Sequence, residues 1–171
     1  MTPLPQAPRI LYLIGLAGVG KNHVGDLIGR RFGYHVYHAD ADLPAEMHEA
    51  VANNVLWTEE QVDGFYTRIR QSVRELAAIH PRIVVTQATY FQRHRDLMRE
   101  AFPDVELLWI VADHEVNVLR IRERKNYVTV EYFEETRHFF ETPPEGTKVI
   151  VNDGDDSDIL RQLAACYDWT R

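Results

Sequence analysis

Residues 10–33 constrain the fold of this chain more than any other stretch. An apolar run, Ile10–Ile14, precedes the sequence Gly15-Leu-Ala-Gly-Val-Gly-Lys21-Asn22, and an apolar pattern at helical spacing follows. This order predicts a buried strand, a G-x-x-x-x-G-K turn and a helix, the setting that a phosphate-binding loop requires. Glycines let successive backbone N–H groups turn inward around phosphate oxygens, and the helix N-terminus adds its dipole. The alternative is a glycine-rich turn that only closes a strand–helix unit.

The loop predicts a site for a nucleoside triphosphate. Lys21 is expected to reach the β- and γ-phosphates as a point charge. Asn22 stands where the motif normally has Ser or Thr, whose hydroxyl binds Mg²⁺. Because an amide oxygen also binds hard cations, Asn22 is a candidate metal ligand. The candidate nucleotide-binding residues of this stretch are Gly15, Ala17, Gly18, Val19, Gly20, Lys21, Asn22 and His23.

Composition and charge bound the class of protein. A chain of 171 residues with 45% apolar and 26% charged residues fits one globular domain, 1–171, with residues 1–8 as a flexible, proline-rich lead-in. A net charge of −7 argues against a nucleic-acid partner. No apolar run approaches the length of about 20 residues that a membrane span needs. The single cysteine, Cys166, fits a reducing compartment, so a cytoplasmic location is expected.

Short apolar runs alternate with helical patterns along the chain, which predicts a parallel sheet with helices on both faces. In such sheets, ligands bind beyond the carboxyl ends of the strands. Thr58-Glu-Glu-Gln61 predicts a capping box at the start of one long helix. The expected strands are Ile10–Ile14, Tyr34–His38, Ile83–Thr86, Leu107–Val111 and Val149–Val151. The expected helices cover about Lys21–Arg31, Thr58–Ile79, Phe91–Ala101, Glu115–Arg124, Glu131–Phe139 and Ser157–Tyr167.

Two carboxylates follow the second expected strand, in His38-Ala-Asp40-Ala-Asp42. In an extended segment, residues two apart point the same way, so both side chains are expected to face the phosphate-binding loop. Asp40 is a candidate for holding a metal-bound water or for acting as a base, and Asp42 for gripping the acceptor. The alternative is that both residues form a turn that caps a helix.

Basic residues are the remaining candidates. The segment from about residue 120 to 138 opens with Arg120-Ile-Arg-Glu-Arg124-Lys125 and is expected to be a lid. Its cations would stabilise charge on a transferring phosphoryl group. The alternative, here and for arginines on the long helix, is a solvated helix face. Candidates for a clamp on a carboxylate or phosphate of the acceptor are Arg68, Arg70, Arg93 and Arg95.

Four stretches of the chain together resemble the small kinases of the shikimate and gluconate type, within the nucleoside-monophosphate-kinase-like P-loop fold. They are the glycine-rich loop, the Asp40-x-Asp42 pair, residues 83–99 and residues 119–144. The likeness is closest to gluconate kinase. Residues 83–99 are similar to its strand followed by a basic helix start, and residues 119–144 are similar to its lid, which closes on a proline pair.

The resemblance implies a three-layer α/β/α fold, a five-stranded parallel sheet of order 2-3-1-4-5 and a helical lid. It implies a monomeric or homodimeric kinase that uses ATP and Mg²⁺ to phosphorylate a hydroxyl of a polar metabolite such as a sugar acid. It assigns the triphosphate to the loop glycines and Lys21, a metal or base role to Asp40 and the lid cation to Arg124. It makes Arg120 a nucleobase or phosphate contact. The residues that it places near the acceptor are Asp42, Arg93 and Arg95.

The chain also departs from that pattern, chiefly in the acceptor half. Asn22 replaces the metal-binding hydroxyl, Glu60-Gln61 stands where gluconate kinases have Asp-Arg, and Phe91 replaces a lysine. Two other functions therefore stay open. One is a nucleoside or nucleotide kinase, in which an aromatic side chain (Tyr66, Tyr90 or Phe91) stacks on a base. The other is a nucleotide-binding protein with weak or no kinase activity.

Overall fold

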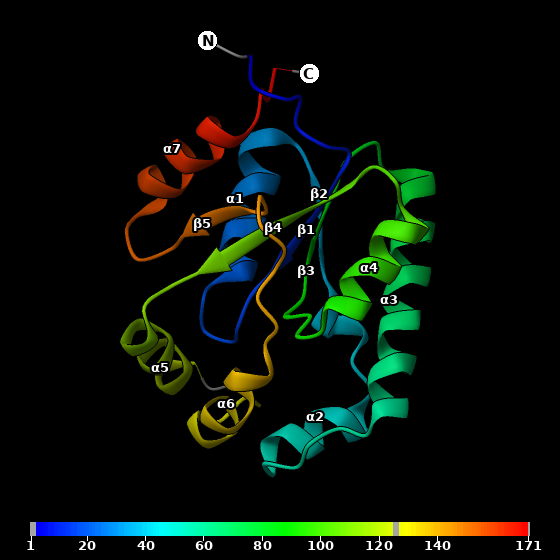
Figure 1. Ribbon diagram of the computed structural model, residues 1–171, viewed down its shortest axis with the longest axis vertical. Coiled ribbons are helices and arrows are strands. Elements are labelled where there is room, and N and C mark those ends of the chain that lie inside the picture. Colours follow the sequence, from blue (N-terminus) through cyan, green and yellow to red (C-terminus); the bar gives the residue numbers. More distant parts are fainter. Residues whose placement is uncertain (1–2, 125–126, 171) are drawn as a thin grey trace.

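The computed structural model describes residues 3–124 and 127–170, which form the predicted three-layer α/β fold (Figure 1). The strands pair in parallel in the order β2-β3-β1-β4-β5, as the resemblance implied. The strands are β1 Ile10–Ile14, β2 His35–His38, β3 Ile83–Thr86, β4 Val105–Val111 and β5 Lys148–Val151. The helices are α1 Lys21–Phe32, α2 Ala45–Ala52, α3 Glu59–Ile79, α4 Gln92–Ala101, α5 His114–Glu123, α6 Val130–Thr136 and α7 Asp156–Cys166.

The central strand, β1, shows why the molecule has three layers. All five of its residues are buried, and successive side chains point to opposite faces of the sheet. Ile10, Tyr12 and Ile14 join one core with side chains of α2, α3 and α4. Leu11 and Leu13 join a second core with side chains of α1 and α7. A near-continuous apolar run is therefore what a strand covered on both faces needs.

The predicted capping box is confirmed at the N-terminus of α3. The Gln61 backbone N–H donates to Thr58 Oγ1 at 3.2 Å, and the Thr58 backbone N–H donates to Gln61 Oε1 at 2.9 Å. These two bonds satisfy N–H groups that a helix start leaves without partners. They begin the helix at Glu59.

Three local features differ from the expectation. Residues 39–42 form a 3-10 turn where an extended segment was expected, and α2 was not expected at all. The predicted helix Glu131–Phe139 divides into α6 and a 3-10 turn at Arg137–Phe139. Helix α2 has eight residues and buries only Met47 and Val51, so its apolar periodicity is too short to stand out.

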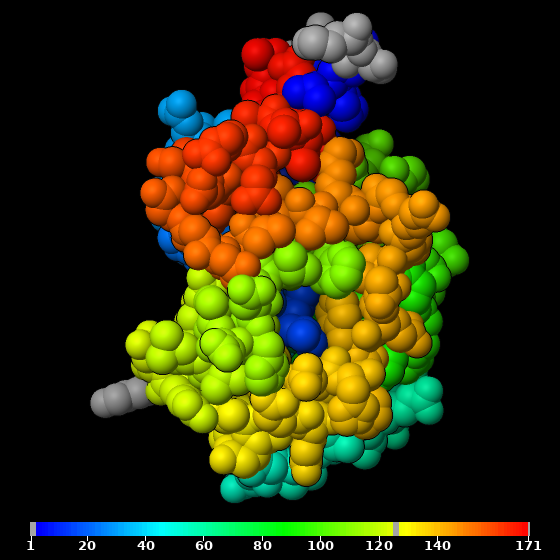
Figure 2. Space-filling model, turned by 60° about the vertical axis from the view of Figure 1, so that its left-hand side comes forward, coloured from blue at the N-terminus to red at the C-terminus, as the bar shows by residue number. Residues whose placement is uncertain are grey.

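The carboxyl ends of the strands face the end of the molecule where α2, α5 and α6 gather (Figure 1). Figure 2 shows a hollow between α5 and the chain around and after α6, with atoms from the N-terminal part of the chain at its base. At the opposite end, Gln6 of the expected lead-in forms a parallel bridge with Asp168. Within the described residues, no helix is both long and apolar enough to cross a membrane.

Candidate active site

The loop between β1 and α1 has the geometry of a phosphate-binding loop. Gly20, at the N-cap of α1, has a left-handed φ of 87°, and a Cβ there would lie 2.2 Å from Asn152 Nδ2. Only glycine fits both constraints. The side chain of Val19 is buried in the core with α1 and α7, so this residue offers the loop only its backbone.

Two carbonyl groups of the loop, those of Gly18 and Val19, have partners on the β4–β5 side. Asn152 Nδ2 donates to Val19 O at 2.8 Å, and Arg120 Nη1 lies 3.3 Å from Val19 O and 3.4 Å from Gly18 O. Arg120 Nη2 also donates to Asn152 O at 2.8 Å. Arg120, predicted to contact a nucleobase or phosphate, thus braces the loop from the β4–β5 side. These contacts hold the Gly18–Val19 part of the loop in the shape in which backbone N–H groups at a helix start can bind an anion.

Lys21 arches back over the loop. Its Nζ donates to Leu16 O at 2.8 Å, and its side chain lines a cavity at the carboxyl end of the sheet. Burial lowers the pKa of Lys21 to about 8, against the opposing attraction of the Asp40 carboxylate. A phosphate group in this cavity would give the ammonium a stronger partner than a carbonyl.

Asn22 belongs to a chain of hydrogen bonds that the sequence did not reveal. The Thr86 hydroxyl donates to Asn22 Oδ1 at 2.6 Å, and His38 Nδ1 lies 2.9 Å from the same hydroxyl oxygen. His38 Nε2 in turn lies 2.9 Å from Asp26 Oδ1. These partners come from α1, β2 and β3, and they orient the amide of Asn22 beside the cavity.

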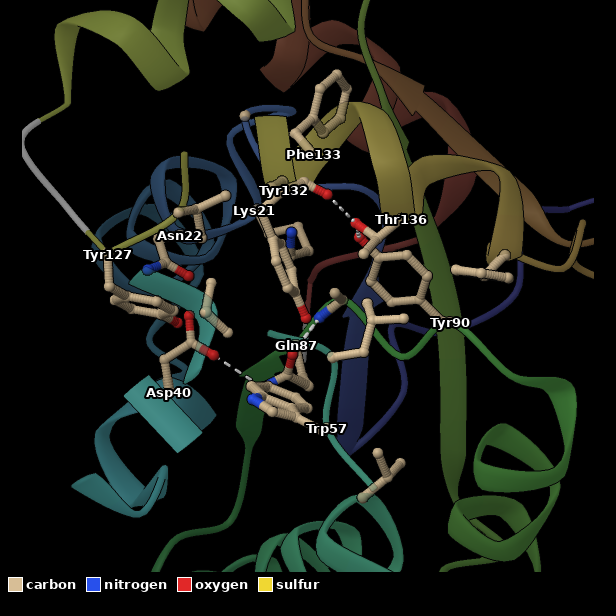
Figure 3. A pocket seen from close by; sticks show the side chains of 18 of the residues that line it. Lys21, Asn22, Asp40, Trp57, Gln87, Tyr90, Tyr127, Tyr132, Phe133 and Thr136 are labelled. Atoms are coloured by element: carbon tan, nitrogen blue, oxygen red, sulfur yellow. Dashed lines mark hydrogen bonds between the residues drawn. The ribbon is translucent and has the colours of Figure 1, made fainter. Parts of the chain in front are cut away.

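Asp40 lines the cavity and lies between Tyr127 and Gln87 in Figure 3. Its Oδ1 accepts a hydrogen bond from Gln87 Nε2 at 2.9 Å. Burial raises the pKa of the Tyr127 hydroxyl, and the neighbouring Asp40 carboxylate raises it further. Gln87 is oriented by the Ala88 backbone N–H, which donates to Gln87 Oε1 at 2.7 Å. Gln87 follows β3 directly, so its position after a strand is the signal that marks it as a site residue.

Asn22 and Asp40 fit the chemistry of a Mg²⁺ site. Both line the cavity beside Lys21, and amide and carboxylate oxygens are ligands that hard cations prefer. Within residues 3–124 and 127–170, no group of three or more His, Cys, Asp and Glu side chains could hold a metal ion. A Mg²⁺ ion would therefore take its other ligands from phosphate oxygens and water, as it commonly does.

The expectation that Asp42 faces the loop together with Asp40 is wrong. Residues 39–42 form a 3-10 turn, in which side chains two apart differ in direction by about 240°. Asp42 Oδ2 accepts hydrogen bonds from the hydroxyls of Tyr37 and Ser72, both at 2.6 Å. Arg68 Nε lies 3.6 Å from Asp42 Oδ1, so these two predicted acceptor residues pair with one another outside the cavity.

The other predicted acceptor arginines also have partners within the chain. Arg95 is fully buried and donates to the carbonyls of Thr89 at 2.9 Å, Tyr90 at 3.0 Å and Glu141 at 2.7 Å. Arg93 pairs with Asp63 at 2.7 Å, in a depression next to the cavity. Neither arginine lines the cavity itself.

The cavity has a volume of about 350 Å³ and two chemically different halves. The phosphate-loop half contains Ala17, Gly18, Gly20, Lys21 and Asn22, whereas Gly15 and His23 do not line it. His23 instead lies 2.6 Å from Asp156 on the outer surface. Aromatic side chains dominate the other half, among them Trp57, Tyr66, Tyr90, Tyr127, Tyr132 and Phe133.

Part of the segment that is predicted to be a lid lies at this cavity. Arg124, at the end of α5, and α6 both contribute to its lining. Lys125, the last cation of the predicted basic segment, lies outside the described residues. Arg124 is therefore the described cation that the segment places near Lys21.

Comparison with known proteins confirms the resemblance to small P-loop kinases, although no family model matches the chain. A shikimate kinase from Cupriavidus pinatubonensis (strain JMP 134 / LMG 1197) is 30% identical over 115 residues, which cover 63% of this chain and 59% of that protein. The matched stretches span between 19% and 59% of the length of the curated relatives.

Solved structures show the same fold. A sugar kinase from Janibacter sp. HTCC2649, solved without ligand, superposes with a TM-score of 0.80 at 19% identity, over 95% of this chain and 99% of its own. A gluconokinase from Sinorhizobium meliloti 1021 superposes with a TM-score of 0.78 at 19% identity, over 94% of this chain and 92% of its own. The architecture of this chain is thus that of small P-loop kinases.

Proposed function

We propose that this protein, which has the fold of the small P-loop kinases, transfers the γ-phosphoryl group of ATP to a hydroxyl group of a small molecule. The observation that carries the proposal is the shared cavity of Lys21, Asn22 and Asp40, which continues into a half that the phosphate loop does not fill. A monomer or homodimer and a cytoplasmic location are part of this proposal.

The residues divide the chemistry among them. The loop N–H groups bind the phosphates and Lys21 offsets charge on the γ-phosphoryl group. Asn22 would hold Mg²⁺, which neutralises phosphate charge, and Asp40 would hold one of the water molecules of the ion. The acceptor oxygen bonds to the γ-phosphorus, and the bond to the β,γ-bridging oxygen breaks. ADP leaves, and the acceptor proton passes to the Asp40 carboxylate. Arg124 adds positive charge where negative charge spreads in the transition state.

Two classes of acceptor follow from the sequence. A polar metabolite such as a sugar acid is supported by the sugar kinase and the gluconokinase among the structural neighbours. A nucleoside is supported by the aromatic side chains, including Tyr66, Tyr90 and Phe91, that line the cavity.

A second candidate function is nucleotide binding without efficient catalysis. Asn22 favours it, because this amide replaces the hydroxyl that normally binds the metal and is already bonded to Thr86. The variant Asn22→Thr separates the two functions. A rise in turnover of tenfold or more would identify a weakened kinase, whereas loss of an existing activity would identify Asn22 as an adapted ligand.

The first prediction concerns Lys21. We expect the wild-type protein to release ADP from Mg-ATP when one member of a panel of sugar acids, shikimate, sugars, nucleosides and nucleoside monophosphates is added. Lys21→Ala should lower that rate at least about 100-fold, because it removes the cation of the phosphate site. Arg161→Ala, which changes an exposed cation on α7, is the matched control. Unchanged ATP affinity and turnover in Lys21→Ala would contradict the proposal.

A further inference from the structure

The two sides of the phosphate loop are chemically distinct. On the β4–β5 side, Arg120 and Asn152 engage the loop carbonyls. On the β2–β3 side lies the cavity, with Asp40 after β2 and Gln87 after β3. Since Asp40 and Lys21 meet on the second side, the hydroxyl group that receives the phosphoryl group must enter there.

Charge is scarce in this acceptor half. Among the described residues that line the cavity, the charged side chains are Lys21, Arg124 and Asp40. Both cations lie toward the triphosphate, and Asp40 is an anion at the point where the acceptor hydroxyl must lie. Among residues 3–124 and 127–170, the lining offers no further cation to pair with a carboxylate or phosphate on the acceptor, and leaving a buried charge unpaired is costly.

The nearby arginines do not supply the missing cation. Arg93 lines a depression that shares Trp57, Val62 and Phe91 with the cavity wall, but it pairs with Asp63 at 2.7 Å and lies 3.5 Å from Glu59. The carboxylate of Glu141 also lines that depression. The net charge of the side chains around this depression is therefore neutral or negative, not positive.

Aromatic rings, and not charged groups, dominate the lining of this acceptor half. Trp57 donates its indole N–H to Met47 O at 2.9 Å, which engages its polar edge and leaves ring surface for the cavity (Figure 3). Tyr66 is 5% exposed and braced from behind by His94, whose ring stacks at 4.2 Å and 20°. Rigid rings of this kind bind planar apolar groups through contact area and stacking.

The polar groups of this half are neutral hydroxyls and amides. Tyr132 points from α6 into the cavity, and burial raises the pKa of its hydroxyl to about 12 (Figure 3). Tyr90 lies 3.4 Å from the Thr136 hydroxyl, which itself donates to Tyr132 O. Hydroxyls that stay protonated suit hydrogen bonds to carbonyl, hydroxyl or ring nitrogen atoms of an uncharged ligand.

We propose that the acceptor is an uncharged hydroxyl compound with a planar aromatic body, and not a sugar acid. The aromatic body lies between the Trp57 and Tyr66 side of the cavity and the α6 side, with its hydroxyl toward Asp40. This inference rests on the proposed kinase function, because that function makes this half of the cavity the acceptor subsite.

Binding and transfer are measured separately, so that the two proposals fail separately. Equilibrium dialysis in the presence of Mg²⁺ and AMPPNP, a non-hydrolysable ATP analogue, compares thymidine and 2-(4-hydroxyphenyl)ethanol with D-gluconate and shikimate. We expect a neutral aromatic probe to bind at least tenfold more tightly than either acid. Equal or tighter binding of an acid, or no binding of either aromatic probe at 10 mM (about the weak limit of specific sites), overturns the inference.

Two variants test the role of the residues that line the acceptor half of the cavity. Trp57→Leu should weaken binding of the aromatic probe at least tenfold. Leu56→Arg changes a cavity residue that is 52% exposed, so it adds a cation with little risk to folding. It should reduce the ratio of the dissociation constant of the acid to that of the aromatic probe at least fivefold. An unchanged ratio in a folded Leu56→Arg protein would overturn the inference.

Phosphorus NMR of the same mixtures with Mg-ATP then follows product formation. An aromatic probe that binds as expected but is never phosphorylated counts against the kinase proposal. The preference of the cavity for uncharged aromatic ligands would stand in that case.

Discussion

The tripeptide Arg93-His94-Arg95 at the start of α4 looks like an exposed basic cluster, yet only Arg93 is exposed. Arg95 donates to the backbone carbonyls of Thr89, within the β3–α4 loop, and of Glu141, and its guanidinium lies 4.6 Å from the centre of the Phe140 ring. A buried guanidinium needs such a set of acceptors to offset the loss of water. Arg95 therefore fixes the loop that carries Tyr90 instead of meeting the acceptor.

His94 makes stability depend on pH. The residue is 2% exposed, and burial together with the charge of Arg93 lowers its pKa from 6.5 to about 4. The unfolded chain binds a proton at His94 more readily than the folded protein does. The contribution of His94 to the free energy of unfolding is therefore full above about pH 6.5 and decreases as the pH falls toward 4. Between pH 7.5 and 4.5 this loss should be about 2.5 kcal/mol.

Urea denaturation at the two pH values measures this loss. His94→Gln should reduce the pH dependence of the free energy of unfolding by about 2 kcal/mol, whatever its effect at pH 7.5. His138→Gln, on an exposed histidine, is the control and should leave the dependence unchanged. Equal pH dependence in the wild type and His94→Gln would show that folding does not change the pKa of His94.

At the scale of elements, local sequence signals predicted the strands and the long helices well. Most of the strands are short apolar runs, and the capping box of Thr58 and Gln61 starts α3 at the expected place. The boundaries of β4 and β5 differ by one or two residues, which is ordinary for strand ends. Helix α2 and the 3-10 turn at Ala39–Asp42 were missed because they are short, and their residue pattern also fits other structures.

Helix α1 packs so closely on the sheet that it requires a glycine on its inner face. A Cβ at Gly29 would lie 2.4 Å from Val36 Cγ2 of β2 and 3.2 Å from Tyr34 O. Gly29→Ala should therefore destabilise the protein by about 1–3 kcal/mol, although alanine is the better helix former. The control, Gly64→Ala on the exposed side of α3, meets no atom within 4 Å and should stabilise by up to about 1 kcal/mol. Urea denaturation that gave both changes the same sign would contradict the close packing.

At the scale of the whole molecule, the cavity exists because segments far apart in the chain meet at the carboxyl end of the sheet. The phosphate loop, the turn after β2, the loop after β3 and helix α6 each contribute one wall. Parallel strands make this convergence unavoidable, since all of them end at the same edge. The order β2-β3-β1-β4-β5 then separates the Asp40 side of the phosphate loop from the Arg120 side.

Substitution of Arg124 tests whether this residue, at the end of α5, stabilises the transition state of phosphoryl transfer. Arg124→Ala should lower kcat about 100-fold or more, while the ATP dissociation constant changes little, because the charge it stabilises develops during transfer. Arg122→Ala, also exposed and in the last turn of α5 but outside the cavity lining, is the matched control. Steady-state kinetics and ATP titrations give both quantities, and equal losses in the two variants would exclude a specific role for Arg124.

From the sequence alone follow the phosphate loop, the parallel sheet and the candidates Lys21, Asn22 and Asp40. These inferences depend on neighbouring residues: the spacing of glycines, the length of an apolar run and the position just after a strand. Only the tertiary structure decided which charges remain available to a ligand. Asp42 accepts a hydrogen bond from Ser72, and Arg95 donates to the backbone carbonyl of Glu141, 46 positions away along the chain. Such pairs form when packing brings distant segments together, because a buried charge needs a partner and takes whichever one the fold places within reach.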